Sequence, residues 1–131
     1  MKDLFVPYEI ALKLKELGFD EECLGWYAKD IVPRNVNGVF IGKHFSTSYK
    51  IGCYAPLYQQ AFKFFREKYK LEIDFTFHTD YLKSGDKNVY EICIQDYTFD
   101  KSYLITPLNG YKTYEEAELE AIKHLIKICC K

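Results

Sequence analysis

The stretch APLYQQAFKFFREKYKLEIDFTFHTDY, residues 55–81, decides the fold because its hydrophobic period changes part-way along it. In the first half the apolar residues recur three and four positions apart, which predicts a helix from Pro56 to Tyr69. In the second half apolar and polar residues alternate, which predicts a strand from Leu71 to Tyr81 with one buried and one wet face. A helix therefore leads directly into a strand, and the apolar faces of both can meet in one core.

The segments that follow complete a pattern of sheet and helix. A second alternating run, Val89–Phe99, comes after a short turn-rich connection, so the two runs predict an antiparallel hairpin. Tyr103–Ile105 predicts a third strand. Thr113 and Glu116 have the spacing of a capping box, which predicts that the last helix begins there and continues to Ile128.

The N-terminal half has weaker signals. A helix is predicted over Tyr8–Leu17, and Gly18 follows it as a residue able to take a positive φ. Asp20–Tyr27 is interpreted as a tight turn that leads into an aromatic pair. Val39–Ile41 and Phe45–Ile51 predict two short strands that form a hairpin.

These elements together predict an α+β fold with two layers, in which helices cover an antiparallel sheet. The order is α-β-β-(β)-α in residues 56–128, with an N-terminal helix and a short hairpin before it. A chain of 131 residues fits one domain, so we expect a single α+β domain over residues 1–131.

Composition excludes several classes of protein. The net charge is −1 and no long basic run is present, so a strong electrostatic grip on duplex DNA is not expected. The N-terminal residues lack the pattern of a signal peptide, and no stretch approaches the length of a membrane span, so we expect a soluble, cytoplasmic protein. The five cysteines include the adjacent pair Cys129 and Cys130 but no CxxC pair, which predicts free thiols and no metal site.

Three blocks of the sequence are similar to a known family: FVPYEIALKLKELGFDEECLGWY, APLYQQAFKFFREKYKLEI and YKTYEEAELEAIKHLIKI. They resemble, in order and over about half the chain, a family of small uncharacterised proteins of Bacteroides-type bacteria and their phages or other mobile elements. The resemblance implies a small accessory protein of phage or mobile-element origin, and it implies no particular activity.

The order of elements in residues 56–128 also resembles the topology of a double-stranded-RNA-binding domain. In that family, basic residues at the start of the last helix contact phosphates. Here the matching segment is Tyr114-Glu115-Glu116-Ala117-Glu118, whose acidic side chains would repel phosphate. The departure removes the part that would carry the function, so the resemblance extends to topology alone.

Four groups of residues are candidates for a site. Trp26 and Tyr27, with Tyr58 near them, would form an aromatic anchor for a partner, or they would close one end of the core. Lys63 and Arg66 lie on the outer face of the predicted helix, where they would attract a phosphate or an acidic partner, or simply be solvated.

The wet face of the first long strand forms the third group. His78 lies there between Thr76 and Asp80, with Glu72 and Asp74 along the same face, and Glu91 or Gln95 would join from the paired strand. Such a set could provide a general base or a weak metal site, or it is an ordinary solvated sheet face. The fourth group, Cys53 with His44, would be a nucleophile pair or a buried thiol and a surface imidazole.

No phosphate loop, nucleophile elbow or other catalytic motif is present, so we expect no enzyme activity and no cofactor. Twelve tyrosines are more than one core needs, which favours a binding module for a protein partner. The alternatives are nucleic-acid binding by the half with double-stranded-RNA-binding topology, and a small-ligand binder or enzyme centred on His78.

Overall fold

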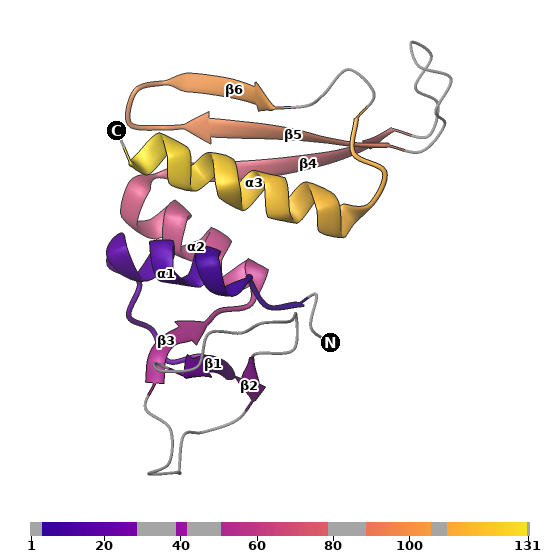
Figure 1. The fold of residues 1–131 in the computed structure, drawn as a ribbon. Helices are drawn as coiled ribbons and strands as arrows, with labels where there is room; N and C mark the ends of the chain where they lie inside the picture. The colour runs from indigo at the N-terminus through magenta and orange to yellow at the C-terminus, as the bar shows by residue number, and fades with distance from the viewer. Residues whose placement is uncertain (1–3, 29–38, 42–50, 79–88, 106–109, 131) are drawn as a thin grey trace. The chain divides into compact units, whose positions relative to one another are not determined.

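The structure of the protein is a computed structural model that describes residues 4–28, 39–41, 51–78, 89–105 and 110–130 (Figure 1). The chain divides into two compact units, Met1–Ala61 and Phe62–Lys131. The boundary falls inside the second helix, so this helix contributes to both. The prediction of a single domain stays a prediction, and each unit is described by itself.

The first unit combines helix α1 with a small antiparallel sheet. Its elements are α1 (Tyr8–Glu16), β1 (Gly25–Ala28), β2 (Phe40–Ile41), β3 (Ile51–Ala55) and the start of α2 (Tyr58–Tyr69). The strand order is β2-β1-β3, so β1 lies between the two others. The predicted segment Phe45–Ile51 lies outside the described residues except for Ile51, where β3 begins.

The strand β1 differs from the sequence interpretation, in which Gly25 belongs to a turn. Gly25 is instead the first residue of the central strand, opposite Ile41 and Ala55. A Cβ atom at Gly25 would lie 2.8 Å from the Phe5 ring and 2.9 Å from the Val39 side chain. Glycine is therefore needed here for close packing within a strand and not for turning the chain.

The predicted first helix is confirmed as α1, including the way it ends. Gly18 has a φ of 102°, the left-handed conformation that glycine adopts most easily. The Gly18 N–H donates to the Lys15 carbonyl and the Phe19 N–H to the Leu14 carbonyl, which is the Schellman pattern. Phe19 is buried, so the residue after the glycine folds back into the core as well.

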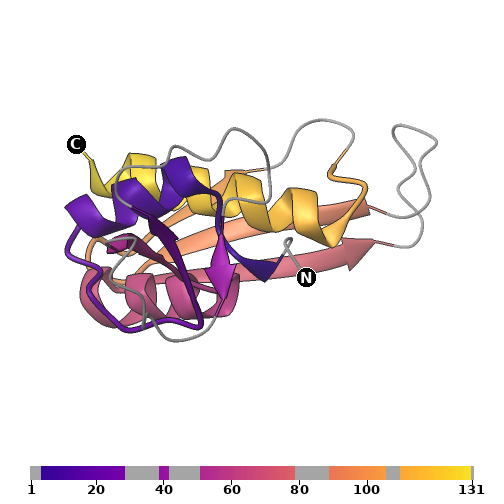
Figure 2. The same ribbon diagram turned by 60° about the horizontal axis from the view of Figure 1, so that its bottom comes forward.

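The second unit is the helix-covered sheet that the sequence predicted. It contains the end of α2, β4 (Leu71–His78), β5 (Val89–Asp96), β6 (Lys101–Ile105) and α3 (Tyr114–Cys129). The strands are antiparallel in the order β4-β5-β6, and β4 and β5 pair without a break from Leu71↔Asp96 to His78↔Val89. The α+β class and the predicted pairing of the two long alternating runs are therefore confirmed. Figure 2 shows the strands and α3 from a second direction.

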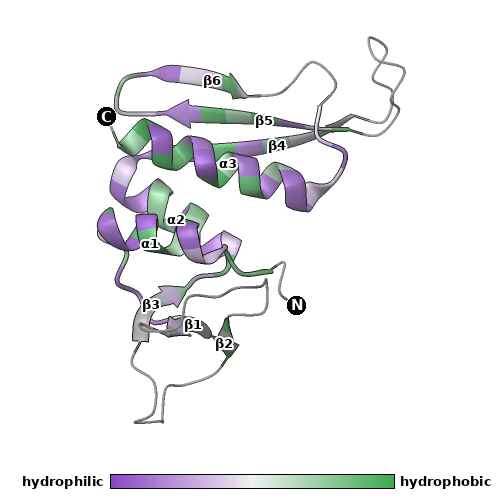
Figure 3. Cartoon of the chain, viewed as in Figure 1, coloured by the Kyte–Doolittle hydropathy of each residue, from purple (hydrophilic) through white to green (hydrophobic). Residues whose placement is uncertain are grey.

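One face of this sheet is packed against helices. The Phe75 ring lies 5.7 Å from the Phe62 ring of α2 and 5.1 Å from the Tyr114 ring of α3, centre to centre. The β5 residues Ile92 and Ile94 are fully buried, and burying one such side chain contributes about 1.5–3 kcal/mol. Along α3 the hydrophobic and hydrophilic residues alternate in bands, as Figure 3 shows, because one stripe of the helix faces the sheet.

The predicted start of the last helix is also confirmed. The Thr113 hydroxyl oxygen accepts a hydrogen bond from the Glu116 backbone N–H at 3.1 Å, so Thr113 is the N-cap. Among the helices in the described ranges, none has the length and apolar character needed to cross a bilayer.

The connection between β5 and β6 is a turn built around Asp96. The buried Asp96 carboxylate accepts hydrogen bonds from the backbone N–H groups of Thr98, at 3.0 Å, and Phe99, at 3.4 Å. A short polar side chain that bonds the backbone two residues ahead is a common way to form a turn. The second predicted strand therefore ends at Asp96 and not at Phe99, since residues 97–100 turn the chain into β6.

Replacing Asp96 by Ala should lower the free energy of unfolding by about 1.5–3 kcal/mol, because two backbone donors lose a charged acceptor. Asp96→Asn keeps an acceptor oxygen at the same position and should recover most of this loss. Urea unfolding of the two variants and the wild type measures both effects. Equal losses for Asn and Ala would contradict the assigned role of the carboxylate oxygen.

Candidate functional site

The second face of the β4-β5-β6 sheet is the candidate functional site. Paired residues in an antiparallel sheet point to the same side and neighbours along a strand to opposite sides, so the register separates this face from the helix-covered one. Val89, which the register also places on this face opposite His78, is fully buried. We call the remaining described side chains the open face, and they are Glu72, Asp74, Thr76, Glu91, Cys93, Gln95, Ser102 and Leu104. All are at least partly exposed to solvent.

The open face is polar except at its β6 side. Leu104 exposes 69% of its surface, although it lies within a regular strand opposite Cys93. Beside it, the Ser102 hydroxyl donates a hydrogen bond to the Gln95 side-chain oxygen across the strands. Leu104 is therefore the large apolar side chain of this face, and it lies on the edge strand.

Acidic groups lie on the same face, toward β4. Asp74 is opposite Cys93 and Glu91 is opposite Thr76, so the two carboxylates are diagonal neighbours across the β4–β5 pair. Glu72 lies one further step along β4, and its carboxylate is 3.7 Å from the Arg66 guanidinium. The open face thus combines an apolar side chain on the edge strand β6 with acidic side chains on β4 and β5.

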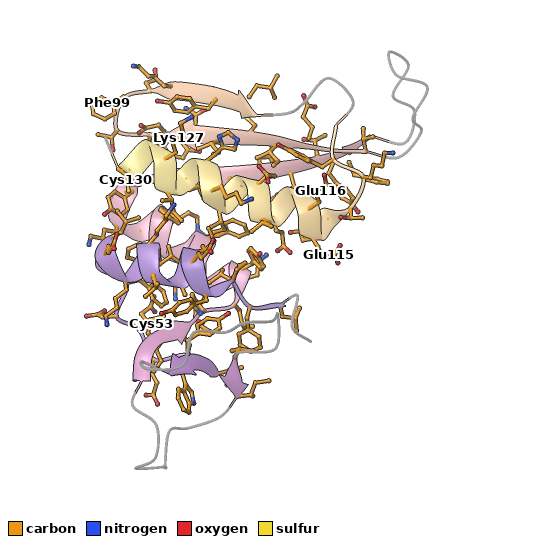
Figure 4. All side chains as sticks on the ribbon, in the orientation of Figure 1. Cys53, Phe99, Glu115, Glu116, Lys127 and Cys130 are labelled. Carbon is orange, nitrogen blue, oxygen red and sulfur yellow. The ribbon has the colours of Figure 1, made fainter. Side chains whose placement is uncertain are left out.

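The turn between β5 and β6 exposes two further aromatic side chains. Tyr97 exposes 67% and Phe99 69% of their surface. Figure 4 shows Phe99 at the end of the sheet where the β5–β6 turn lies. The apolar alternation of the sequence continues past Asp96 and predicts a strand for both residues, whereas Asp96 followed by Thr98 is the signal of a turn.

The predicted aromatic anchor is buried in the first unit. Trp26 and Tyr27 each expose 6% of their surface and Tyr58 exposes 7%. Tyr27 packs against Tyr8 with ring centres 5.2 Å apart, and its hydroxyl donates to the Val6 carbonyl at 2.8 Å. This arrangement matches the interpretation of the pair as core residues, and it leaves little ring surface for a partner.

The basic residues of α2 lie beside acidic groups. Lys63 is 3.9 Å from Glu67, and Arg66 is 3.7 Å from Glu72, with all four side chains well exposed. Glu115 and Glu116 are exposed, and Figure 4 labels them at the start of α3. The positions that contact phosphate in a double-stranded-RNA-binding domain are therefore acidic in the structure too.

The predicted polar site around His78 is only partly described. His78 is the last residue of β4, opposite Val89, while its side chain and Asp80 lie outside the described part of the chain. The register brings Glu91 and Gln95 to the same face as Glu72 and Asp74, as the sequence suggested. Among the described residues, no group of three His, Cys, Asp or Glu side chains could hold a metal ion.

Three thiols, those of Cys23, Cys53 and Cys129, have a raised pKa and so favour the protonated form. Burial, with the nearby Glu21 charge as a lesser cause, raises the pKa of Cys23 to about 12. Burial also raises the pKa of Cys129 to about 11 and that of Cys53, which Figure 4 labels on β3. Because the thiolate is the nucleophile, these environments disfavour thiol chemistry at neutral pH. His44, the proposed partner of Cys53, lies outside the described residues.

Comparison with known proteins gives no match for this chain among protein-family models, curated proteins or solved structures. The functional argument therefore depends on the geometry of the open face and its surroundings.

Replacing Tyr27 by Phe should lower the free energy of unfolding by about 1 kcal/mol, because the hydrogen bond to the Val6 carbonyl is lost. Burial raises the pKa of Tyr27 from 10.0 to about 12, so the unfolded chain ionises this hydroxyl before the folded chain does. The stability that depends on the neutral hydroxyl is fully present below pH 10 and is lost as the pH rises through 12.

Urea unfolding of the wild type and Tyr27→Phe, at neutral pH and between pH 10 and 12, measures this contribution. The difference between the two proteins should shrink over that range. A difference that stays constant with pH would contradict a buried, neutral hydroxyl at this position.

Proposed function

We propose that the protein is a non-catalytic binding module that recognises a protein partner through the open face of the β4-β5-β6 sheet. The observation that carries the proposal is the 69% exposure of Leu104 within an ordered strand. Leu104 is not isolated, because Tyr97 and Phe99 of the same hairpin are exposed as well. Exposed apolar side chains with polar groups around them are typical of protein-binding surfaces, where a few residues often contribute most of the binding energy.

The charges of the open face indicate what kind of partner would fit. Asp74 and Glu91 are diagonal neighbours across the β4–β5 pair. A partner that places an apolar side chain on Leu104 and a lysine or arginine near these carboxylates would be complementary in shape and charge. The exposed Phe99 and Tyr97 at the end of the same hairpin extend the apolar contact area.

Two functions considered from the sequence receive less support. The acidic start of α3 and the ion pairs of Lys63 and Arg66 do not favour nucleic-acid binding. The raised pKa values of Cys23, Cys53 and Cys129 do not favour a thiol enzyme. We also propose, from the three sequence blocks, that the chain belongs to the Bacteroides and phage family and acts in the cytoplasm.

Replacing Leu104 by Ser should weaken binding to the partner about tenfold or more, because a central apolar contact is removed. The partner is first isolated from a Bacteroides-type lysate on the immobilised protein and identified, and its affinity is then measured by calorimetry. Leu24→Ser is the matched control, since Leu24 exposes 63% of its surface but belongs to the first unit.

Charge reversal tests whether the acidic side chains of the open face attract the partner. Asp74→Lys should weaken binding further at low salt than at high salt, because screening reduces the lost attraction. If Leu24→Ser reduces the affinity while Leu104→Ser and Asp74→Lys leave it unchanged, the partner binds elsewhere and the open face is not the site.

A further inference from the structure

The backbone hydrogen bonds between Tyr90 and Tyr111 show toward which neighbouring strand each residue of β5 and β6 points its N–H and C=O groups. Tyr90 and Tyr111 exchange both of their backbone hydrogen bonds, at 2.7 and 3.0 Å. Tyr90 is also paired with Phe77 of β4, so Tyr111 lies on the side of β5 where β6 lies. The backbone groups of Tyr90 therefore point toward β6 and not toward β4.

Along a strand the backbone N–H and C=O groups of successive residues point to opposite sides. Every second residue of β5, counted from Tyr90, therefore forms its hydrogen bonds toward β6. These residues include Ile92 and Ile94, whose partners are Ile105 and Tyr103. Ser102 and Leu104 lie between them, and their N–H and C=O groups must point to the opposite side. They face away from β5 along the outer edge of the sheet, since β6 is the end strand among the described residues (Figure 1).

The edge of β6 is complementary to itself under two-fold symmetry. If Tyr103 lies opposite Tyr103 of a second copy, Ser102 of each chain lies opposite Leu104 of the other. These are the residues whose backbone groups point outward, so the pairing satisfies both donors and both acceptors in each chain. The side chains fit too, because a small Ser102 lies beside a large Leu104 on the same face.

Charge favours the antiparallel arrangement over a parallel one. Lys101 is exposed at one end of β6, and the side chains that follow it along the strand are uncharged. In an antiparallel pair the two Lys101 side chains lie at opposite ends of the interface, whereas in a parallel pair they lie next to each other. A lysine at the strand end therefore disfavours parallel pairing while permitting the antiparallel pair.

We infer that two copies of the chain associate through β6, with Tyr103 on the two-fold axis and Ser102 opposite Leu104 of the other copy. The association joins two three-stranded sheets into one continuous sheet. It places two open faces side by side, which goes beyond the proposed function and does not depend on it. An isologous pair of this kind closes on itself and forms a dimer rather than a filament.

The register is tested by two double variants that differ only at residue 102. In S102E/L104E, each cross-copy pair consists of two carboxylates, so dimerisation should weaken about tenfold or more. In S102K/L104E, each cross-copy pair is an ammonium opposite a carboxylate, so the dimer should form again. Far-UV circular dichroism and thermal unfolding of both variants check that the fold is retained.

Size-exclusion chromatography with light scattering, over about a hundredfold range of loading concentration, reports the oligomeric state. A dimer for the wild type and for S102K/L104E, with a monomer for S102E/L104E, supports the inference. A wild-type monomer at every concentration overturns it. A dimer that neither variant changes, or one that both variants abolish, also overturns it, because the stated register predicts opposite effects.

The test of the dimer and the test of partner binding give results that can be told apart. The binding test compares partner affinities of Leu104→Ser and Leu24→Ser, and Leu104→Ser keeps the outward N–H and C=O groups of the edge. A monomeric wild type that still loses its partner on Leu104→Ser would retain the binding function and remove only the dimer.

Discussion

The packing of the Phe75 ring is the contact on which the second unit depends. Phe75 lies in the middle of β4 and contacts Phe62 of α2 and Tyr114 of α3. One aromatic ring therefore holds two helices on the same face of one sheet, and each such ring pair contributes about 0.5–1.5 kcal/mol beyond the area that it buries. Tyr90 of β5 extends the cluster, with its ring 5.6 Å from that of Tyr114.

This one-sided packing determines which surfaces are available for binding. The helices cover one face, so the opposite face keeps its polar side chains and the exposed Leu104. They do not pair with the sheet edge, and among the described strands none pairs with the outer side of β6, where the backbone groups of Ser102 and Leu104 point. The proposed partner site and the proposed dimer thus both follow from the packing of the helices on one face of the sheet. Both proposals involve non-covalent surface contacts.

The sequence predicted the parts of this arrangement that depend on local periodicity. The alternation in β4 and β5 predicted their pairing, and the Thr113 cap and Gly18 predicted where helices begin and end. Periodicity predicts faces, however, and not which strand lies at the edge. Leu104 lies between Tyr103 and Ile105, and only the strand order shows that it belongs to the open face of an end strand.

Other errors have specific physical causes. Gly25 suggested a turn because glycine is common in turns, but here it allows Phe5 and Val39 to approach the backbone of β1. The exposed rings of Tyr97 and Phe99 were hidden because the apolar alternation continued past Asp96, where side-chain hydrogen bonds turn the chain. In both cases a tertiary contact or a side-chain bond overrode the local pattern.

The most direct measurement compares the unfolding free energies of Phe75→Ala and Phe77→Ala. The two residues lie on the same face of β4, but Phe77 exposes 48% of its surface and contacts only Tyr90 among the ring pairs of the described residues. The account predicts a loss of about 3–4 kcal/mol for Phe75→Ala and about 1 kcal/mol for Phe77→Ala. Equal losses for the two variants would contradict the claim that Phe75 holds the helices on the sheet.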